Sequence, residues 1–496
     1  MGKDFYVPIP LFGGSLPILY PTNRTVEPVN STNFSVPVAP VAPAAKLEQR
    51  RPLARPNSTN LQANDLVIVI IAIFAIVTAA WAMTGGWSQL SSGWSHAWRA
   101  AASLTGLYTS LFGMVGLTLS ARLKTTERAI GLDRLLNWHR IAGDTMGLLL
   151  AVHIFTAIPA EMPVRGGFIN TVLDFTGREP YMALTAIGSA LVAVVVVLSL
   201  KDIRNKISYE TWYFVHLTVY FGLAASFSHQ ITLGSMLSND RYVRLVWVGS
   251  SVVIFATALF GRWWKVFGSV ARPLHVRTIN KETDDTVSVL LGGRNVLRLR
   301  GDAGQFVMIR SLVRGQWWKT NPYSLSAVPT TAGLRVTIKN RGDASSAKRH
   351  LRVGDRVAVE GPYGVTTPEI FGDKRPLFIA GGVGVTPVCA LLQRLPSDSR
   401  PTVLLRARHE NEVAHLAEIR ALAARCGGEV FVLTGRTVAM KGKDPFSAKS
   451  LARAVPEISS CVAVVCGPTA LMFAARKGLR EAGLAKDDIH TEMPWW

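Results

Sequence analysis

Apolar segments of membrane-spanning length dominate the first half of this 496-residue chain. A helix that crosses a lipid bilayer needs roughly 20 predominantly apolar residues, and six segments approach that length. They predict a membrane α-helical bundle of six transmembrane helices. The six segments run roughly over Leu66–Met83, Ala101–Ala121, His139–Ile158, Tyr181–Leu200, Trp212–Leu233 and Val243–Trp263.

Four histidines belong to the third and fifth of these segments, two in each. Ionisable side chains are costly inside a membrane and usually mark function. A helix rises about 1.5 Å per residue, so His139 and His153 lie roughly 21 Å apart along one helix, and His216 and His229 roughly 20 Å apart along another. Two parallel helices would then offer two facing pairs, one near each membrane surface, which is the geometry for two stacked bis-histidine haems. Hydrogen-bonded core histidines are the alternative.

The two histidines of the fifth segment share one helix face less well than the two of the third segment do. At about 100° per residue, His139 and His153 fall within roughly 40° of one direction, whereas His216 and His229 differ by about 140°. A bend near Gly222, or a difference in side-chain reach, would have to let His216 and His229 both face the helix of the third segment. The chain has no CxxCH motif, so the haems would be b-type.

Basic residues set the expected orientation in the membrane. Lys and Arg gather before the first segment and after the second, fourth and sixth, and loops of this kind stay in the cytoplasm. The sequence therefore predicts a multi-pass cell-membrane protein with both termini cytoplasmic, with His139 and His216 near the inner face. The net charge of +21 fits basic residues beside anionic lipid, and no motif for nucleic acid is visible.

Composition divides the chain into four predicted domains. Residues 1–62, rich in Pro, Asn, Ser and Thr, predict a disordered cytosolic tail, and residues 63–266 form the haem domain. Residues 271–372 show short period-two runs, which predict antiparallel strands in a small β-barrel. Residues 375–496 alternate apolar strands with helical stretches such as EVAHLAEIRALAAR, which predicts an α/β domain with a parallel sheet. The motifs described next make the barrel the predicted FAD-binding domain and the α/β domain the predicted NAD(P)H-binding domain. The four cysteines lie in the last quarter without CxxC spacing, which indicates a reduced, cytosolic compartment.

A glycine-rich loop follows the first strand of the predicted parallel sheet, in LFIAGGVGVTP. Its glycines would let backbone N–H groups approach a pyrophosphate at the start of a helix. A later strand of the same sheet ends in CGP, which is placed to meet the nicotinamide end of a dinucleotide. A plain tight turn and an ordinary buried cysteine are the alternatives. The predicted residues are Gly381, Gly382, Gly384, Thr386, Pro387, Cys466, Gly467 and Pro468.

Two arginines follow the next strands of that sheet. Arg408 follows the second strand, where a 2′-phosphate would lie, and Arg436 follows the third. Because Arg pairs well with phosphate, the sequence predicts a preference for NADPH over NADH. Solvated surface arginines are the alternative.

Two motifs in the predicted barrel suit a flavin. NPYS places an aromatic ring and a hydroxyl together, as needed to pack on and hydrogen bond an isoalloxazine and its ribityl chain. IKNRGDAS supplies basic and hydroxyl side chains around a glycine, which could form a phosphate cradle. Each could instead be a strand end with a charged turn. The predicted FAD-binding residues are Asn321, Pro322, Tyr323, Ser324, Lys339, Arg341, Gly342 and Ser345.

Taken together, these motifs resemble a known family. The two histidine pairs, LDRLLNWHRIAG and ISYETWYFVH resemble the ferric reductase transmembrane domain. NPYS, EGPYG, GGVGVTP and CGP resemble the ferredoxin–NADP reductase fold that is joined to it in NADPH oxidases and ferric reductases. The resemblance covers roughly residues 65–496 and implies that NAD(P)H passes hydride to FAD, after which electrons cross the membrane singly through two haems.

Roles for individual residues follow from the resemblance. It implies that Tyr323 and Ser324 contact FAD and that the inner haem is held by His139 with His216, the outer one by His153 with His229. Glu492 and the terminal Trp495–Trp496 resemble the family's acidic-then-aromatic end, which covers the flavin. The predicted catalytic residues are Cys466, Glu492 and Trp496.

Two departures from the family pattern bear on function. Ala157 stands where NADPH oxidases have a further histidine near the oxygen site, which weighs against a dedicated oxidase. Asn321 stands where many relatives have Arg or His, so Lys339 or Arg341 would carry more of the pyrophosphate charge. Arg99, on the outer side of the second segment, would pair with a haem propionate or serve as an interfacial anchor.

The predicted function is a transmembrane oxidoreductase that passes electrons from cytosolic NAD(P)H to an acceptor on the outer side. A ferric chelate is the first choice of acceptor, and superoxide formation from oxygen is the alternative. A haem membrane anchor that exchanges electrons with quinone or a protein partner is another class. That class would leave the nicotinamide motifs unused.

Overall fold

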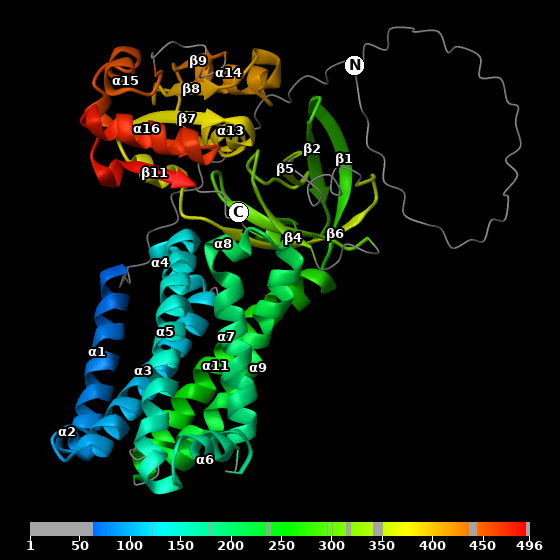
Figure 1. The fold of residues 1–496 in the computed structure, drawn as a ribbon. Helices are drawn as coiled ribbons and strands as arrows, with labels where there is room; N and C mark the ends of the chain where they lie inside the picture. The colour runs from blue at the N-terminus through cyan, green and yellow to red at the C-terminus, as the bar shows by residue number, and fades with distance from the viewer. Residues whose placement is uncertain are drawn as a thin grey trace, which may run out of the picture. The chain divides into compact units, whose positions relative to one another are not determined.

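Helices occupy the chain from Ala63 to Ala271, and two β-sheets follow them (Figure 1). The computed structural model describes residues 63–121, 123–178, 181–234, 237, 240–294, 296–299, 301–313, 319–340, 351–435 and 444–492. The predicted tail lies outside these residues. The helices and both sheets belong to one compact unit, Asn60–Trp496.

The helices are arranged as a bundle in which α3 packs on α5 and α7 packs on α9. A π-helical turn at Ala82–Gly86 joins the first two helices, and another at Asp174–Arg178 follows the sixth. The α-helices are α1 Ala63–Trp81, α2 Trp87–Leu90, α3 Trp94–Ser120, α4 Lys124–Ile130, α5 Leu132–Arg165, α6 Phe168–Leu173, α7 Met182–Ser199, α8 Lys201–Arg204, α9 Tyr209–Leu233 and α11 Arg241–Ala271.

Five of the described helical segments are long and apolar enough to cross a membrane, and they include α1, α3, α5, α7 and α11. These five match five of the six predicted segments in length and hydropathy, whereas their crossing of the membrane stays a prediction. The remaining span corresponds to α9, which is a continuous helix of 25 residues. It falls short of the others in hydropathy because it carries two histidines and several Tyr, Thr and Ser side chains. A sixth span therefore stays a prediction.

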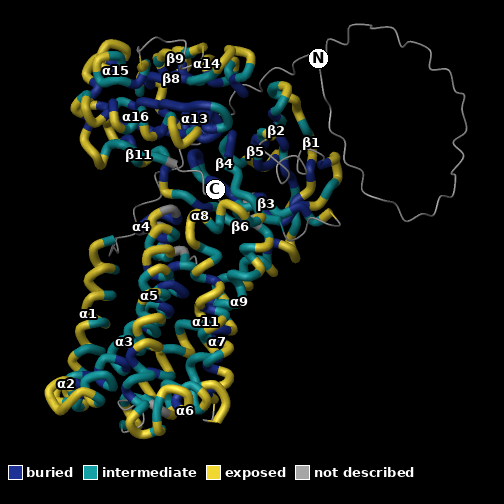
Figure 2. Tube along the Cα trace, viewed as in Figure 1, coloured by how far each residue is buried: buried dark blue, intermediate teal, exposed yellow. Residues whose placement is uncertain are grey.

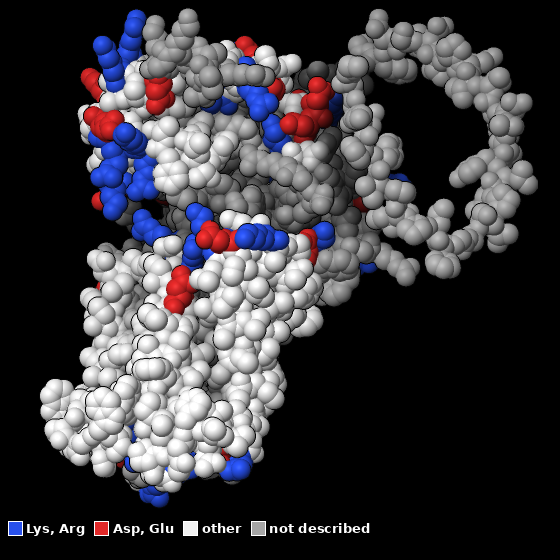
Figure 3. Space-filling view, viewed as in Figure 1, with Lys and Arg blue, Asp and Glu red and all other residues white. Residues whose placement is uncertain are grey.

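The outer surface of the helices is apolar. Side chains such as Ile76 and Phe260 are more than 60% exposed, as expected where lipid rather than protein covers them. Figure 2 shows exposed residues along the helices, and Figure 3 shows that the visible face of the bundle is almost uncharged between its two ends. This pattern fits a membrane protein.

Capping residues define where the two histidine-bearing helices begin and end. Gly131, with φ of 86°, separates α4 from α5, and Gly166 ends α5 in the left-handed region that glycine favours. Ser208 begins α9, because its hydroxyl accepts a hydrogen bond from the N–H of Thr211 at 3.1 Å. Within these boundaries, His139 and His153 lie on one uninterrupted helix, and His216 and His229 lie on another.

The first sheet has six antiparallel strands in the order β4-β3-β6-β1-β2-β5. One bridge between Leu325 and Val336 links the two ends of this order. The strands predicted from period-two runs are confirmed, whereas a closed barrel stays a prediction. The strands are β1 Leu274–Thr283, β2 Thr286–Gly292, β3 Phe306–Ser311, β4 Thr320–Ser324, β5 Leu334–Lys339 and β6 Arg356–Tyr363.

The second sheet has five parallel strands in the order β11-β10-β7-β8-β9. Alternate residues of each strand are buried on opposite faces, under α13 and α14 on one side and α15 and α16 on the other. The strands are β7 Arg375–Gly381, β8 Thr402–Arg406, β9 Glu429–Leu433, β10 Cys461–Cys466 and β11 Ile489–Glu492. The helices are α13 Val385–Arg394, α14 Leu416–Arg425, α15 Ala448–Ala454 and α16 Thr469–Glu481.

One predicted helix begins later than expected. The stretch EVAHLAEIRALAAR suggests a helix from Glu412, but α14 begins at Leu416. His415 just before it has φ of 59° and ψ of 19°, a left-handed conformation that cannot continue a right-handed helix. Contacts of the His415 ring with Ser288, Thr337 and Glu282 account for this conformation.

We predict that the crossing of α7 and α9 depends on Gly188. A Cβ atom there would lie 2.6 Å from the carbonyl oxygen of Gly222, so Gly188→Ala should lower stability by about 1–3 kcal/mol through overpacking. The control is Gly249→Ala in α11, where a Cβ would meet no atom within 4 Å. Thermal unfolding of the detergent-solubilised protein measures both. Equal midpoints for the two variants would contradict the prediction.

Candidate functional site

The structure places the four histidines in two facing pairs between α5 and α9. The ring centroids of His139 and His216 are 6.0 Å apart with an interplanar angle of 67°. Those of His153 and His229 are also 6.0 Å apart, with an angle of 36°. The pairs are the ones predicted from the sequence, and their role as haem ligands stays a prediction.

Helix α3 fixes the two histidines of α5. The Nδ1 atom of His139 lies 2.9 Å from the carbonyl oxygen of Gly116, and that of His153 lies 2.8 Å from the carbonyl oxygen of Ala102. A carbonyl oxygen only accepts hydrogen bonds, so each Nδ1 carries the proton. The lone pair of each neutral ring is then on Nε2, which is the arrangement of a metal-ligating histidine.

Small residues of α3 make room for these rings. A Cβ atom on Gly106 would lie 2.9 Å from the ring of His153, and one on Gly116 would lie 3.7 Å from that of His139. Glycine at position 106 is therefore required for the observed packing. These glycines could not be predicted from the sequence, because their spacing indicates a contact only once the position of α5 is known.

The geometry of both pairs fits a metal centre. Metal–imidazole bonds are about 2 Å long, so two imidazoles on opposite sides of one metal have ring centres roughly 6 Å apart. The Nδ1 atoms of His216 and His229 are buried and have no hydrogen-bond partner among the described residues.

Charged residues surround the end of the bundle beyond His153. Arg99 of α3 forms an ion pair with Glu161 of α5 at 3.1 Å, and Arg165 bonds to both Glu161 and Asp174. Arg99 is therefore held by a carboxylate, while its Nε atom is buried without a hydrogen bond. Whether it also meets a haem propionate stays a prediction.

The first sheet docks on the opposite end of the bundle, near His139 and His216. Leu132 of α5 packs with Phe306 and Tyr363 in a small apolar cluster. Glu210 of α9 forms an ion pair with Lys319 at 3.0 Å, just before β4. These contacts bring the predicted flavin motif close to the predicted inner haem ligands.

The NPYS motif forms most of strand β4, which pairs with β3. Val307 lies opposite Tyr323 and Phe306 opposite Ser324 in that pairing. Burial raises the pKa of Tyr323, so its phenol remains a hydrogen-bond donor. All four predicted residues, Asn321, Pro322, Tyr323 and Ser324, are half-buried on this strand.

The predicted phosphate cradle is only partly described. Lys339 ends β5 and forms an ion pair with Asp285 at 3.2 Å, so its ammonium already has an anionic partner. Arg341, Gly342 and Ser345 lie outside the described residues. The cradle therefore stays a prediction.

The glycine loop and the CGP turn meet at the carboxyl edge of the parallel sheet. A Cβ on Gly384 would lie 2.4 Å from the carbonyl oxygen of Cys466, and one on Gly467 would lie 2.9 Å from that of Gly381. Strands β7 and β10 are neighbours from which the chain leaves in opposite directions. Ligands of open α/β sheets bind at such a topological switch point.

Other predicted dinucleotide residues differ in their surroundings. The hydroxyl of Thr386 donates to the carbonyl oxygen of Val383 at 2.8 Å, so it shapes the loop itself. Pro387 is buried in the first turn of α13, and Pro468 immediately precedes α16. Arg408 is exposed after β8, and Arg436 lies outside the described residues.

Two of the three predicted catalytic residues, Cys466 and Glu492, lie on neighbouring strands at the same edge. Cys466 is buried at the end of β10, with Ala380 of β7 on one side and Glu492 of β11 on the other. Strand β11 was not predicted from the sequence, because its four residues carry no apolar run. The side chain of Glu492, and Trp495 and Trp496, lie outside the described residues.

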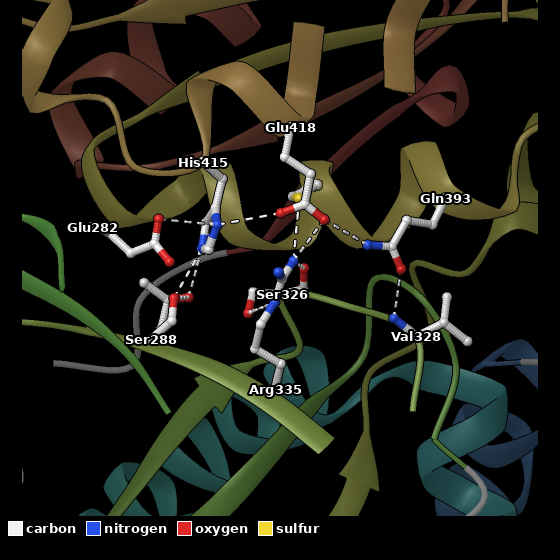
Figure 4. Close-up of polar contacts among 10 residues, drawn as sticks. Glu282, Ser288, Ser326, Val328, Arg335, Gln393, His415 and Glu418 are labelled. Atoms are coloured by element: carbon white, nitrogen blue, oxygen red, sulfur yellow. Dashed lines mark hydrogen bonds and ion pairs between the residues drawn. The ribbon is translucent and has the colours of Figure 1, made fainter. Parts of the chain in front are cut away.

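The sequence analysis missed two buried polar groups. Arg310 of β3 forms an ion pair with Glu360 of β6 at 3.4 Å, and both side chains are largely buried. A charge within each apolar run could have indicated this pair. A second network joins His415 to Glu418 and to the hydroxyl of Thr337, and Glu418 in turn to Arg335 (Figure 4). No local pattern signals that network.

Comparison with known proteins agrees with this arrangement. Residues 100–227 match the family of ferric reductase like transmembrane components, and residues 378–477 match the oxidoreductase NAD-binding domain. The first match contains His139, His153 and His216 and ends two residues before His229. The second contains both the glycine loop and the CGP turn.

Three curated relatives illustrate the similarity. The ferredoxin reductase component of 3-ketosteroid-9-alpha-monooxygenase from Mycolicibacterium smegmatis is 30% identical over 46% of this chain and 66% of its own length. A flavohemoprotein from Chromobacterium violaceum is 30% identical over 48% of this chain and 63% of its own length. Human NADPH oxidase 3 is 21% identical over 56% of this chain and 55% of its own length.

These findings define a membrane-associated oxidoreductase with FAD- and NAD(P)H-binding domains behind a ferric reductase-like transmembrane component. The resemblance to the ferric reductase and NADPH oxidase family, predicted from the motifs, is thereby confirmed. The chain spans less than two thirds of the length of the relatives named above. Their activities therefore enter only as proposals.

We predict that Gly384 is required for dinucleotide binding. The clash of a new Cβ with the backbone of Cys466 and Gly467 should push the two loops apart, so Gly384→Ala should weaken NAD(P)H binding by about tenfold or more, or about 1.4 kcal/mol. Flavin and haem content should not change. Gly268→Ala is the control, since a Cβ there meets nothing within 4 Å. Titration with NADPH measures both, and unchanged affinity in Gly384→Ala would refute the role of this loop.

Proposed function

We propose that the protein is a transmembrane flavohaem reductase that passes electrons from cytosolic NAD(P)H through FAD and two b-type haems to an acceptor on the outer side. A ferric chelate is the acceptor we favour. The observation that carries the proposal is the two facing histidine pairs, in one chain with a dinucleotide-binding sheet. The overall change would be one NAD(P)H oxidised to NAD(P)⁺ and a proton, with two ferric ions reduced to ferrous.

The residues of the chain would divide this task by position. The Gly381–Pro387 loop and the CGP turn would bind the dinucleotide. Tyr323 and Ser324 would hold the flavin on the first sheet. The contacts of Leu132 and Glu210 with that sheet would keep the flavin near the inner end of the bundle.

The histidine pairs would carry the bound haems at two depths. His139 with His216 would hold the inner one, and His153 with His229 the outer one. Haems held in this way would supply single-electron transfer between the flavin and the outer side. Hydrogen bonds from His139 and His153 to carbonyl oxygens of α3 would keep each Nε2 available for iron.

The membrane topology follows from the same proposal. Helix α9 would be a sixth span despite its lower hydropathy, because its histidines face α5 and hydroxyls such as those of Thr218 and Ser228 bond to carbonyl oxygens of the same helix. Both termini would then be cytoplasmic, as the distribution of Lys and Arg predicts. A multi-pass location in the cell membrane results.

Oxygen is the second candidate acceptor. It is favoured by the similarity to NADPH oxidase 3, whereas Ala157 in place of the family's further histidine favours the chelate. A haem anchor serving quinone or a protein partner would not oxidise NAD(P)H. Turnover with NADPH therefore separates the classes.

We predict two low-spin haems per chain. His153→Ala should lose one haem and largely keep the other, because the inner pair makes no contact with that ring. His96→Ala, an exposed histidine near the same end of the bundle, is the control and should keep both. The pyridine haemochrome assay counts haem per chain. A count of one in the intact protein would exclude the two-haem arrangement.

The acceptor can be tested with purified protein in lipid nanodiscs. NADPH oxidation should be faster with a ferric chelate such as ferric citrate than with oxygen alone, and ferrous iron should appear at two per NADPH. His153→Ala should abolish ferric reduction while leaving flavin reduction by NADPH intact. Superoxide as the main product, with little ferrous iron, would support the oxidase alternative. No NADPH oxidation in the intact protein would overturn the proposal.

A further inference from the structure

A buried histidine, His415, connects the antiparallel sheet with the parallel sheet. His415 precedes α14 of the parallel sheet, yet its ring lies among strands of the antiparallel sheet, and its side chain is 2% exposed. Its Nε2 atom lies 2.8 Å from the hydroxyl of Thr337 and 3.2 Å from that of Ser288. Its Nδ1 atom lies 3.3 Å from a carboxylate oxygen of Glu282 (Figure 4).

Glu418 extends this contact into a network. One of its carboxylate oxygens lies 3.5 Å from the Nδ1 atom of His415, and the other accepts hydrogen bonds from Arg335 at 2.9 Å and Gln393 at 3.0 Å. Gln393 in turn accepts a hydrogen bond from the backbone N–H of Val328 at 2.9 Å. Strands β1, β2 and β5 of one sheet are thereby tied to α13 and α14 of the other.

The backbone at His415 indicates that this position is imposed by the network. A φ of 59° is uncommon for a residue other than glycine or asparagine. Such conformations persist where the surrounding structure over-determines them, and they cluster at sites where geometry matters. The hydrogen bonds at both ring nitrogens account for it here.

A metal site is the main alternative for this cluster. Ligand atoms of Cys389, His415 and Glu418 all lie within 4.8 Å of one another. However, the guanidinium of Arg335 lies 3.6 Å from the sulfur of Cys389 and 2.9 Å from Glu418, so a cation already occupies the space between these ligands. Burial raises the pKa of the Cys389 thiol, which disfavours a thiolate ligand. The cluster is therefore satisfied without a metal.

The charges of the network complement one another. His415 faces the carboxylates of Glu282 and Glu418, and behind Glu418 lie the guanidinium of Arg335 and the thiol of Cys389. Burial alone would raise the pKa of Glu418, but hydrogen bonds from His415 and Arg335 outweigh it and lower the pKa to about 2. A lowered pKa stabilises the fold above the ordinary value near 4.5, and this contribution fades as the pH falls towards 2. The Glu418 carboxylate is therefore charged throughout the neutral range.

We propose that this network, the His415 latch, formed by His415, Glu418, Arg335 and Glu282, sets the alignment of NAD(P)H with FAD. His415 is then a positioning residue, because it acts through the orientation of the parallel sheet and touches neither cofactor site. The inference rests on the proposed function, in which hydride passes from the nicotinamide on one sheet to the flavin on the other.

Hydride transfer is the step that should depend on the latch. The reacting atoms must approach to about 3–3.5 Å, and a misplacement of about 1 Å can cost roughly 100-fold in rate. Electron transfer from FAD to the inner haem depends instead on the contacts of the antiparallel sheet with the helices. None of the latch residues takes part in those contacts, so the two steps should separate.

The test uses the full-length holoprotein and three variants. His415→Leu removes all hydrogen bonds of the ring. His415→Asn keeps a hydrogen-bonding side chain that tolerates the left-handed conformation, and Glu418→Gln removes the carboxylate charge. The control is Arg420→Ala on α14, which breaks an exposed ion pair with Glu410, a residue that precedes this helix. Stopped-flow flavin reduction over a range of NADPH concentrations gives a limiting rate and a dissociation constant.

The expected result is a split between these two quantities. His415→Leu should lower the limiting rate by about 10-fold to 100-fold, while the dissociation constant for NADPH stays within about threefold. Haem reduction after photoreduction of the flavin should keep its rate. His415→Asn should recover most of the loss, Glu418→Gln should fall in between, and Arg420→Ala should match the native protein.

Several outcomes would overturn the latch. One is an unchanged limiting rate in both His415→Leu and Glu418→Gln. Another is stoichiometric zinc in the native protein that is lost in His415→Leu, which would assign the cluster to a metal. Absence of flavin reduction in the native protein would instead overturn the proposed function. Hydrogen exchange of β5 then decides about the latch, since its amides should exchange faster in His415→Leu than in Arg420→Ala.

Discussion

The cost of burying imidazoles among apolar helices shapes the membrane part of this protein. Each ring on α5 is held by a carbonyl oxygen of α3, at 2.9 Å for His139 and 2.8 Å for His153. Those carbonyls are reachable because α3 carries glycine where the rings lie, above all Gly106. The buried Nδ1 atoms of His216 and His229 have no such partner among the described residues. In each pair, the ring on α5 is thus fixed by a hydrogen bond to α3, whereas the ring on α9 is placed by the packing of its helix.

Much of this arrangement could be predicted because its determinants are local. Span length and the residue types in each apolar run indicated the helices, and the offsets within HRIAGDTMGLLLAVH and HLTVYFGLAASFSH indicated which histidines would share a depth. The glycine loop and the CGP turn were predicted in the same way, because each joins a recognisable strand to a helix. The exception is α9, where functional residues and packing lower the hydropathy that identifies a span. Haem binding would require histidines on that helix, whereas insertion into a membrane requires apolar side chains.

What could not be predicted depends on contacts between distant segments. Strand β11 is recognisable only beside β10, where Glu492 meets Cys466. Lys339 forms an ion pair with Asp285, a carboxylate partner that the local motif did not indicate. His415 lies in a stretch with helical periodicity, yet it leaves the helix because its ring is bonded to Ser288 and Thr337, more than 75 residues away in sequence. Local propensity is overruled there by tertiary contacts.

The same contrast explains how the two halves of the reductase part can serve different steps. Apolar packing of Leu132 with Phe306 and Tyr363 joins the antiparallel sheet to the helices, and such packing tolerates little rearrangement. The two sheets are joined by the hydrogen bonds and ion pairs around His415 and Glu418, which weaken steeply with small displacements, and by the packing of Ala303 and Val328 on the core of the parallel sheet. In the proposed cycle a dinucleotide would enter and leave at every turnover, whereas the flavin would stay near the inner haem. Directional polar contacts beside a packed core suit the joint between the sheets, because they fix one alignment of the nicotinamide with the flavin. Apolar burial at Leu132, with the ion pair of Glu210 and Lys319, suits the joint with the helices, because it holds a single position throughout the cycle.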